Sequence, residues 1–167
     1  MGIDVTKRYS ATIRTSFGKI EVALNALAAP RTVNNFIFLA LHHFYDGQVF
    51  HRVVKDKAIY TGDPTGSGAG GPGYTFDDGR ATGAPYEIGS VAMVATRRST
   101  LGSQFFIVSG PDGCGIPPVY TLFGKVTHGL RTIEGIQNAP TSRLLDVRTY
   151  RPTTDIVVES VTISIDD

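Results

Sequence analysis

The sequence predicts a mainly β domain, a barrel or a sandwich with two helices, on three observations. Short β-branched and aromatic runs recur along the chain, and clusters of Gly, Pro and Ser separate them. Only two segments show the three- and four-residue apolar spacing of a helix. The chain has 167 residues, which fits one domain, and no linker divides it. We therefore expect a single domain over residues 1–167, with residues 1–9 as an N-terminal extension.

The first third of the chain predicts a hairpin, a helix and two more strands. Residues 11–15 and 19–24 alternate apolar and polar side chains on either side of a Ser-Phe-Gly turn. A proline at position 30 suits the first turn of a helix, and the apolar spacing that follows predicts a helix ending near Gly47. Residues 49–54 and 58–60 are rich in β-branched and aromatic side chains, which favours strands.

The rest of the chain predicts more strands and one short helix. The helix is expected over residues 130–137, with Ile133 and Ile136 on its buried side. Residues 141–154 have a charged, turn-like composition, which indicates a long surface connection. The remaining strands are predicted at residues 89–94, 104–108, 120–126 and 160–165.

A glycine-rich loop over residues 62–73 lies between these two parts of the chain. Residues 66–71 satisfy the pattern G-x-G-x-x-G, but Gly-Pro-Gly at 71–73 prevents the helix that dinucleotide binding requires. We therefore interpret the segment as a surface loop whose backbone needs positive φ angles or a close approach to another segment.

Composition excludes several classes of function. A net charge of +1 provides no strong field for nucleic acid or an anionic membrane, and we expect neither as a partner. The single cysteine, the polar N-terminus and the lack of a long apolar run favour a cytoplasmic location. No histidine is spaced with Cys, Asp or Glu as a metal ligand would be, so we expect no metal and no cofactor. We also expect a monomer.

Arg52 is the candidate functional residue that the pattern itself selects. It follows Phe50 in an apolar run, and strand alternation predicts that the two side chains face the same way. One interpretation is an arginine on the solvated face of a half-exposed strand. The other is a permanent cation presented on an apolar wall.

Several blocks of the sequence, from about Ser10 to Asp166, resemble the cyclophilins, a family of peptidyl-prolyl cis-trans isomerases. The blocks are Ala-Pro-Arg-Thr-Val-Asn-Asn-Phe at 29–36, Phe-His-Arg-Val-Val at 50–54, Gly-Asp-Pro-Thr-Gly at 62–66, Gly-Gly-Pro-Gly-Tyr at 70–74, Gly-Ser-Gln-Phe-Phe-Ile at 102–107 and Tyr-Thr-Leu-Phe-Gly-Lys-Val at 120–126. The resemblance implies a closed eight-stranded antiparallel β-barrel capped by an α-helix at each end.

The resemblance also implies a reaction and the residues that perform it. Rotation about a peptide bond meets a barrier of about 18–20 kcal/mol, which an arginine lowers by hydrogen bonding to the prolyl nitrogen as conjugation is lost. Arg52 matches the family's catalytic arginine. Phe50 and Phe106 match walls of its proline pocket, and Gln104 matches a polar residue of its peptide groove.

The sequence departs from the family's pattern mainly at this site. Lys57, Ala58 and Tyr60 stand where Phe, Met and Gln are usual. Val94 and Ala95, followed by Thr96, Arg97 and Arg98, alter the peptide-binding rim. The loop containing Ile116 lacks the Trp often found there, and Tyr120 replaces a groove His. All these positions are candidate substrate-binding residues.

Three functions remain open on this basis. The first is a cofactor-free isomerase of Xaa-Pro bonds in peptides or unfolded proteins, with weakened or altered peptide specificity. The second is a scaffold whose pocket, with Arg52, Lys57, Tyr60 and Arg97, binds a small molecule and catalyses its cyclisation or rearrangement. The third is a non-catalytic binding module for a partner chain. A fold does not by itself choose among them.

Overall fold

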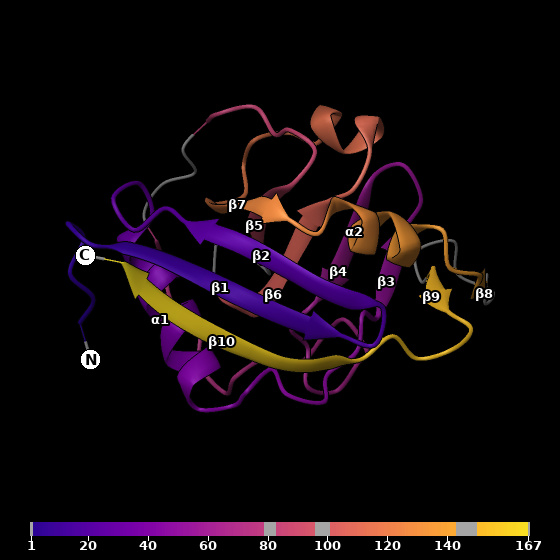
Figure 1. Cartoon of the computed structure of the whole chain (residues 1–167), viewed down its shortest axis with the longest axis horizontal. Coiled ribbons are helices and arrows are strands. Elements are labelled where there is room, and N and C mark those ends of the chain that lie inside the picture. The colour runs from indigo at the N-terminus through magenta and orange to yellow at the C-terminus, as the bar shows by residue number, and fades with distance from the viewer. Residues whose placement is uncertain (1, 79–82, 96–100, 143–149, 167) are drawn as a thin grey trace.

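Eight antiparallel strands form one curled sheet in the computed structural model, which describes residues 2–78, 83–95, 101–142 and 150–166 (Figure 1). The sheet order is β10-β1-β2-β7-β5-β6-β4-β3. The eight strands are β1 (Arg8–Thr15), β2 (Gly18–Leu24), β3 (Arg52–Val54), β4 (Ala58–Thr61), β5 (Ser90–Ala95), β6 (Leu101–Val108), β7 (Leu122–His128) and β10 (Val158–Asp166). The predicted mainly β fold is confirmed, and Arg8 and Tyr9 of the predicted extension belong to β1.

The word "closed" overstates how the barrel is built. The edge strands β3 and β10 do not pair with each other in the part of the chain that the structure describes. Instead, the segment before β3 meets the start of β10: Phe50 donates its N–H to the Ile156 carbonyl at 3.0 Å, and Val158 donates to Gln48 at 2.7 Å. The sheet therefore curls until its two edges are bridged by a few backbone hydrogen bonds rather than by a ladder.

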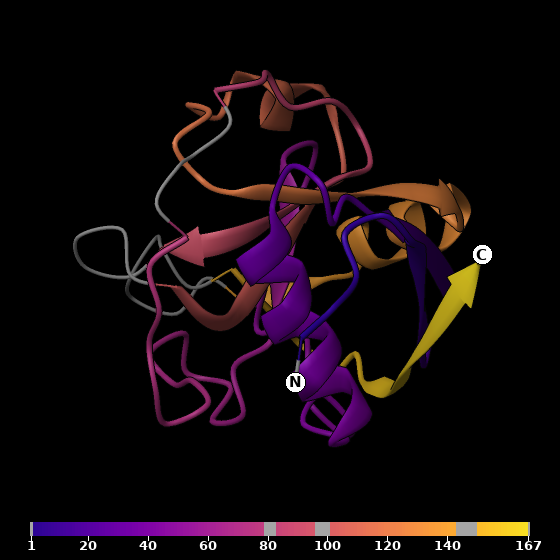
Figure 2. The same cartoon turned by 90° about the vertical axis from the view of Figure 1, so that its left-hand side faces the viewer.

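Two α-helices lie toward opposite ends of the curled sheet (Figure 1), and in Figure 2 α1 faces the viewer with α2 behind it. Helix α1 (Pro30–Leu41) begins at its proline as predicted but ends six residues before Gly47, because His43 adopts a positive φ of 57°. Helix α2 (Leu130–Gln137) confirms the predicted bounds and buried side. Neither helix has the length and apolar run that crossing a membrane would require, and the described residues contain no other candidate.

Four short elements differ from the sequence prediction. The predicted strand over residues 49–54 is shorter, since β3 begins only at Arg52 and Val49 forms an isolated bridge with Val157. Within the predicted surface connection, β8 (Thr141–Ser142) pairs with β9 (Arg151–Pro152). A 3₁₀ helix, η2 (Pro111–Gly115), follows β6 and was not predicted.

The two faces of the sheet carry two separate apolar clusters. We call the larger one the interior cluster; it lies inside the curl and includes Phe36, Ile59, Met93, Phe105 and Phe123. We call the smaller one the outer cluster; it consists of Ala58, Tyr86, Ala92, Phe106, Val108 and Ile116, with Tyr60, Val94, Tyr120 and Leu122 packed against it. Successive residues of β4, β5 and β6 alternate between the two clusters, because side chains of a strand alternate between its faces.

Candidate active site

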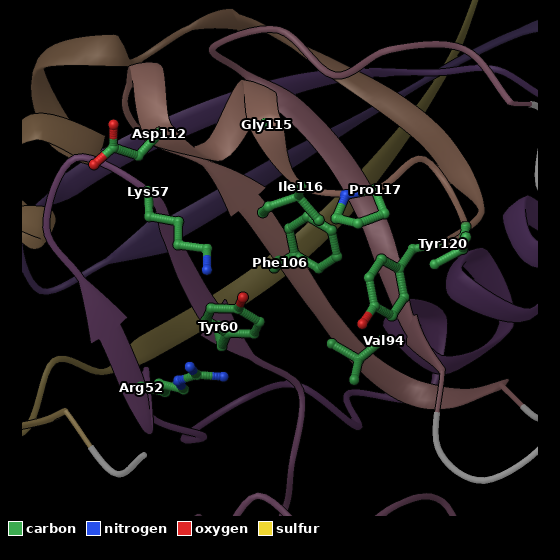
Figure 3. A pocket seen from close by; sticks show the side chains of 11 residues that line it. Arg52, Lys57, Tyr60, Val94, Phe106, Asp112, Gly115, Ile116, Pro117 and Tyr120 are labelled. Atoms are coloured by element: carbon green, nitrogen blue, oxygen red, sulfur yellow. The ribbon is translucent and has the colours of Figure 1, made fainter. Parts of the chain in front are cut away.

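A pocket of about 360 Å³ opens on the outer face of the sheet, above the outer cluster (Figure 3). Its walls come from β3, β4, β5 and β6, from η2, and from the loop that leads into β7. The lining residues are Arg52, Lys57, Tyr60, Val94, Phe106, Asp112, Gly115, Ile116, Pro117, Val119 and Tyr120. Segments far apart in the chain thus combine cations, aromatic rings and small apolar side chains in one pocket.

Arg52 lies at one edge of the pocket and packs on Tyr60. The two residues are directly opposite in the antiparallel ladder between β3 and β4, so their side chains leave the same face of the sheet. The Arg52 Cζ lies 4.8 Å from the centroid of the Tyr60 ring, within the range of a cation–π contact. The Arg52 Nε is buried and has no hydrogen-bond partner among the described residues. The guanidinium is thus held by a ring, and its Nε donor is unpaired within the described part of the chain.

Phe106 forms the floor of the pocket. Its ring is 1% exposed and lies 5.5 Å from the Tyr60 centroid and 5.5 Å from the Tyr120 centroid. Tyr86 packs edge-on from the far side at 5.9 Å, and its hydroxyl donates to the Tyr120 carbonyl at 2.8 Å. The same hydroxyl accepts the Tyr120 N–H at 3.0 Å. These contacts fix the loop that supplies the wall opposite Arg52.

Tyr60 is a hydrogen-bond donor at neutral pH. Burial raises the pKa of its phenol above the ordinary value, and the positive charge of Arg52 offsets this only in part. The hydroxyl therefore keeps its proton and points toward the ammonium of Lys57 in the pocket (Figure 3).

The turn that carries Lys57 is held by η2 through close backbone contact. The Lys57 carbonyl accepts the Ser109 N–H at 3.0 Å, and the Asp56 carbonyl accepts the Asp112 N–H at 2.9 Å. A Cβ on Gly113 would overlap the Lys57 carbonyl oxygen, so only glycine allows this approach. The backbone of Lys57 is therefore fixed at the rim of the pocket.

Gln104 positions the glycine-rich loop instead of lining the pocket. Its Nε2 donates to the Gly68 and Gly70 carbonyls at 3.1 and 2.8 Å. Asp63, at the start of that loop, accepts hydrogen bonds from Thr65 and from the loop backbone. Burial alone would raise the pKa of Asp63, but the bonds from Thr65, Gly70 and Gly68 outweigh it and hold the pKa at about 2. The prediction of a loop that makes close backbone approaches is confirmed.

Most of the predicted site residues meet in this pocket, and a few do not. Those that line it are Arg52, Lys57, Tyr60, Val94, Phe106, Ile116 and Tyr120. Phe50 packs in the interior cluster, so it faces away from Arg52 rather than beside it as alternation predicted. Ala58 is fully buried in the outer cluster beneath the pocket, and Ala95 packs against the interior cluster. The predicted rim residues Thr96, Arg97 and Arg98 lie outside the described residues.

The sequence did not single out Asp112, Gly115, Pro117 or Val119. All four belong to η2 or to the loop after it, where no apolar period marks a face. The available signal was Gly110 followed by Pro111 and Asp112, because a proline at the first turn with an acidic residue after it is typical of a helical start.

Comparisons with known proteins agree with the fold. The model of the family described as cyclophilin type peptidyl-prolyl cis-trans isomerase/CLD matches residues 10–163. Peptidyl-prolyl cis-trans isomerase-like 3 of Rattus norvegicus is 36% identical over 158 residues, which cover 92% of this chain and 95% of the relative. Peptidyl-prolyl cis-trans isomerase B of Streptomyces anulatus is 37% identical over 174 residues, with the same two coverages.

Solved structures give the same result. The crystal structure of a cyclophilin type peptidyl-prolyl cis-trans isomerase from Cryptosporidium parvum has a TM-score of 0.85 and 28% identity, covering 96% of this chain and 99% of the other. A second crystal structure, in the presence of the dipeptide Ala-Pro, has a TM-score of 0.83 and covers 93% and 98%. The resemblance seen in the sequence is confirmed, and the chain belongs to the cyclophilin-type peptidyl-prolyl cis-trans isomerase family.

Proposed function

We propose that this chain catalyses the cis–trans isomerisation of Xaa-Pro bonds in peptides, with a peptide preference altered by the side chains around its pocket. The observation that carries the proposal is the placement of Arg52 at the edge of an apolar pocket floored by Phe106. A relative from Cryptosporidium parvum was crystallised in the presence of Ala-Pro, which supports a proline-containing peptide as the substrate here.

The chemistry requires only that the twisted peptide bond be stabilised. In the planar ground states the prolyl nitrogen lone pair is conjugated with the carbonyl and accepts no hydrogen bond, whereas in the twisted state it is free to accept one. The Arg52 guanidinium remains charged at every working pH and offers planar donors for this bond. Its interaction is therefore stronger in the transition state than in either ground state, which is the condition for catalysis.

The pocket walls supply the binding of the proline ring. Phe106 provides the apolar floor, and Val94 and Ile116 provide side walls. Arg52 approaches from the side of Tyr60, which holds its guanidinium by the cation–π contact. This placement lets the ring stay fixed while the preceding carbonyl rotates.

The same walls support an altered preference. Lys57 places a charged, half-buried side chain where an apolar wall would contribute roughly 1.5–3 kcal/mol of transfer energy to a bound proline. A peptide that offers only apolar contacts therefore loses affinity. A peptide that offers a partner to the polar rim recovers it.

Two-dimensional NMR exchange on the peptide acetyl-Ala-Ala-Pro-Ala-amide tests the proposal, since it detects slow catalysis without a coupled protease. We expect the wild type to accelerate exchange and Arg52→Ala to lose about 10²–10³-fold of the acceleration. Arg52→Lys keeps the charge but loses the planar donors, so it is expected to lose most of the rate as well. Thermal melts of all three proteins check folding.

Two results would contradict the proposal. One is a folded wild-type protein that does not accelerate exchange at all. The other is an Arg52→Ala variant that retains the wild-type rate.

A further inference from the structure

The pocket holds more positive charge than its own residues balance. Among the described lining residues, Arg52 and Lys57 are cationic, and Asp112 carries the carboxylate. In Figure 3 the Lys57 ammonium points into the pocket toward Tyr60, whereas the Asp112 carboxylate points away from it. Within residues 2–78, 83–95, 101–142 and 150–166, neither cation forms an ion pair.

Two lysines elsewhere on the molecule are paired with carboxylates. Lys19 pairs with Glu21 at 2.8 Å, and Lys125 pairs with Glu87 at 2.7 Å. Lys57 is less exposed than an ordinary surface lysine, and its backbone is fixed by Ser109 and Gly113. The half-buried Lys57 side chain has no acidic partner among the described residues, so its ammonium is available to an anion bound in the pocket.

From this charge arrangement we infer that the pocket selects proline peptides carrying an acidic side chain on the residue next to the proline, with Lys57 as the specificity-determining residue. The inference rests on the proposed function, because a proline ring seated on Phe106 is what places the neighbouring residue at the rim. Consecutive Cα atoms are about 3.8 Å apart, so a carboxylate one residue from the proline stays at the pocket mouth.

The two cations and a phenol can share one carboxylate. Arg52 and Lys57 lie on either side of Tyr60 (Figure 3), and the Tyr60 hydroxyl is a donor. A carboxylate accepts several charge-assisted hydrogen bonds at once, whereas the matching amide of Gln accepts fewer and carries no charge. Charge complementarity of this kind contributes more to the discrimination between acidic and neutral peptides than to the affinity for either.

Isosteric peptide pairs test the inference. We would compare acetyl-Ala-Pro-Glu-Ala-amide with acetyl-Ala-Pro-Gln-Ala-amide, and acetyl-Ala-Glu-Pro-Ala-amide with acetyl-Ala-Gln-Pro-Ala-amide. A third pair, acetyl-Ala-Ala-Pro with a free or an amidated C-terminus, separates a main-chain carboxylate from an acidic side chain. Each peptide receives two measurements: the dissociation constant by NMR titration and the catalytic efficiency by exchange.

We expect Glu to exceed Gln by about three- to five-fold at low salt in one of the first two pairs, the upper range for a half-exposed ion pair. The preference should fall toward unity at about 1 M salt, where screening acts within about 3 Å. Lys57→Gln should bring the Glu-to-Gln ratio most of the way to one, whatever it does to turnover, because only Arg52 and Tyr60 of the three donors remain to bind the carboxylate. Lys55→Gln, which removes an exposed lysine from the same turn, should leave the ratio unchanged.

The outcomes separate this inference from the proposed function. If every peptide is isomerised and the Glu and Gln peptides have equal catalytic efficiency, the inference is overturned and the proposed function stands. A preference seen only for the peptide with a free C-terminus has the same meaning. A Glu preference of undiminished size in Lys57→Gln also overturns the role of Lys57. A Glu preference in the dissociation constants without any catalysis supports the charge selection and contradicts the proposed function.

Discussion

Strands β4, β5 and β6 present two faces with different chemistry. The interior face carries Ile59, Met93 and Phe105, which are apolar and almost completely buried. The outer face carries Tyr60, Val94 and Phe106, which line the pocket together with two cations. The interior face is packed solid with apolar side chains, whereas the outer face leaves a pocket open to ligands. Because adjacent residues of one strand serve both faces, the chemistry of the site can change while the packing that defines the fold stays the same.

The two sides are also held together differently. The interior cluster is stabilised by aromatic packing, as where Phe105 meets Phe36 edge-on at 5.5 Å. The outer side adds hydrogen bonds and close backbone contacts, such as those of Asp63 and Gly113, to the packing of Phe106 on its three neighbouring tyrosines. Substitutions on the two sides should therefore affect different quantities.

The largest expected effect is on the interior face. Phe105→Ala removes a ring that also packs on Tyr45 and Phe123, so the free energy of unfolding should fall by about 3–5 kcal/mol in urea titrations. Val119→Ala, at the exposed pocket rim, should change it by less than about 0.5 kcal/mol. Similar losses in the two variants would break the distinction between the faces.

The next effect concerns the loop anchored by Asp63. Its folded pKa of about 2 lies below the unfolded value, so its contribution to stability is present above about pH 4 and is lost as the pH falls toward 2. This contribution is about 2 kcal/mol. Asp63→Asn should remove that part of the acid sensitivity of the unfolding free energy. An unchanged pH profile in the variant would show that the hydrogen bonds to Asp63 do not stabilise the fold.

An effect of similar size is expected where η2 meets the turn that carries Lys57. Gly113→Ala forces a Cβ against the Lys57 carbonyl and should lower the unfolding free energy by about 1–3 kcal/mol. It should also raise the KM for a proline peptide, because the pocket rim shifts. Gly115→Ala is the matched control for the stability measurement, since its Cβ would meet no atom within 4 Å. Equal stability of the two variants would refute the close backbone fit.

The smallest effect is on the ring under Arg52. Tyr60→Phe keeps a face for the guanidinium, whereas Tyr60→Leu loses a contact of about 0.5–1 kcal/mol. Catalytic efficiency on a neutral peptide should therefore fall about two- to five-fold in Tyr60→Leu relative to Tyr60→Phe. Equal rates would mean that the ring does not orient Arg52.

The sequence predicted the regular parts of the fold well. Period-two alternation located β1, β2 and β10, β-branched and aromatic runs located the other strands of the main sheet, and helical spacing located α1 and α2. The periodic patterns record which face each side chain buries. The prediction that Phe50 and Arg52 face the same way was wrong, because it also relied on alternation. Alternation assumes a continuous strand, but β3 begins at Arg52, and the irregular backbone before it turns Phe50 into the interior.

The candidate site was predictable where single positions could be compared with the family. Tyr60 and Phe106 on strands, and Ile116 and Tyr120 in the loop before β7, were found through the resemblance. The contribution of η2 to the rim was missed, since its position depends on glycine contacts between segments about fifty residues apart. No local pattern encodes such an approach.

The measurement that tests the central claim most directly is a map of backbone amide chemical shifts during titration with acetyl-Ala-Ala-Pro-Ala-amide. The pocket on the outer face predicts saturable shifts at Lys57, Tyr60, Phe106 and Tyr120. A second groove, lined in part by Arg31, Phe38 and Tyr74 beside α1, should stay unchanged. Shifts confined to that second groove, with the outer-face pocket unaffected, would contradict the account.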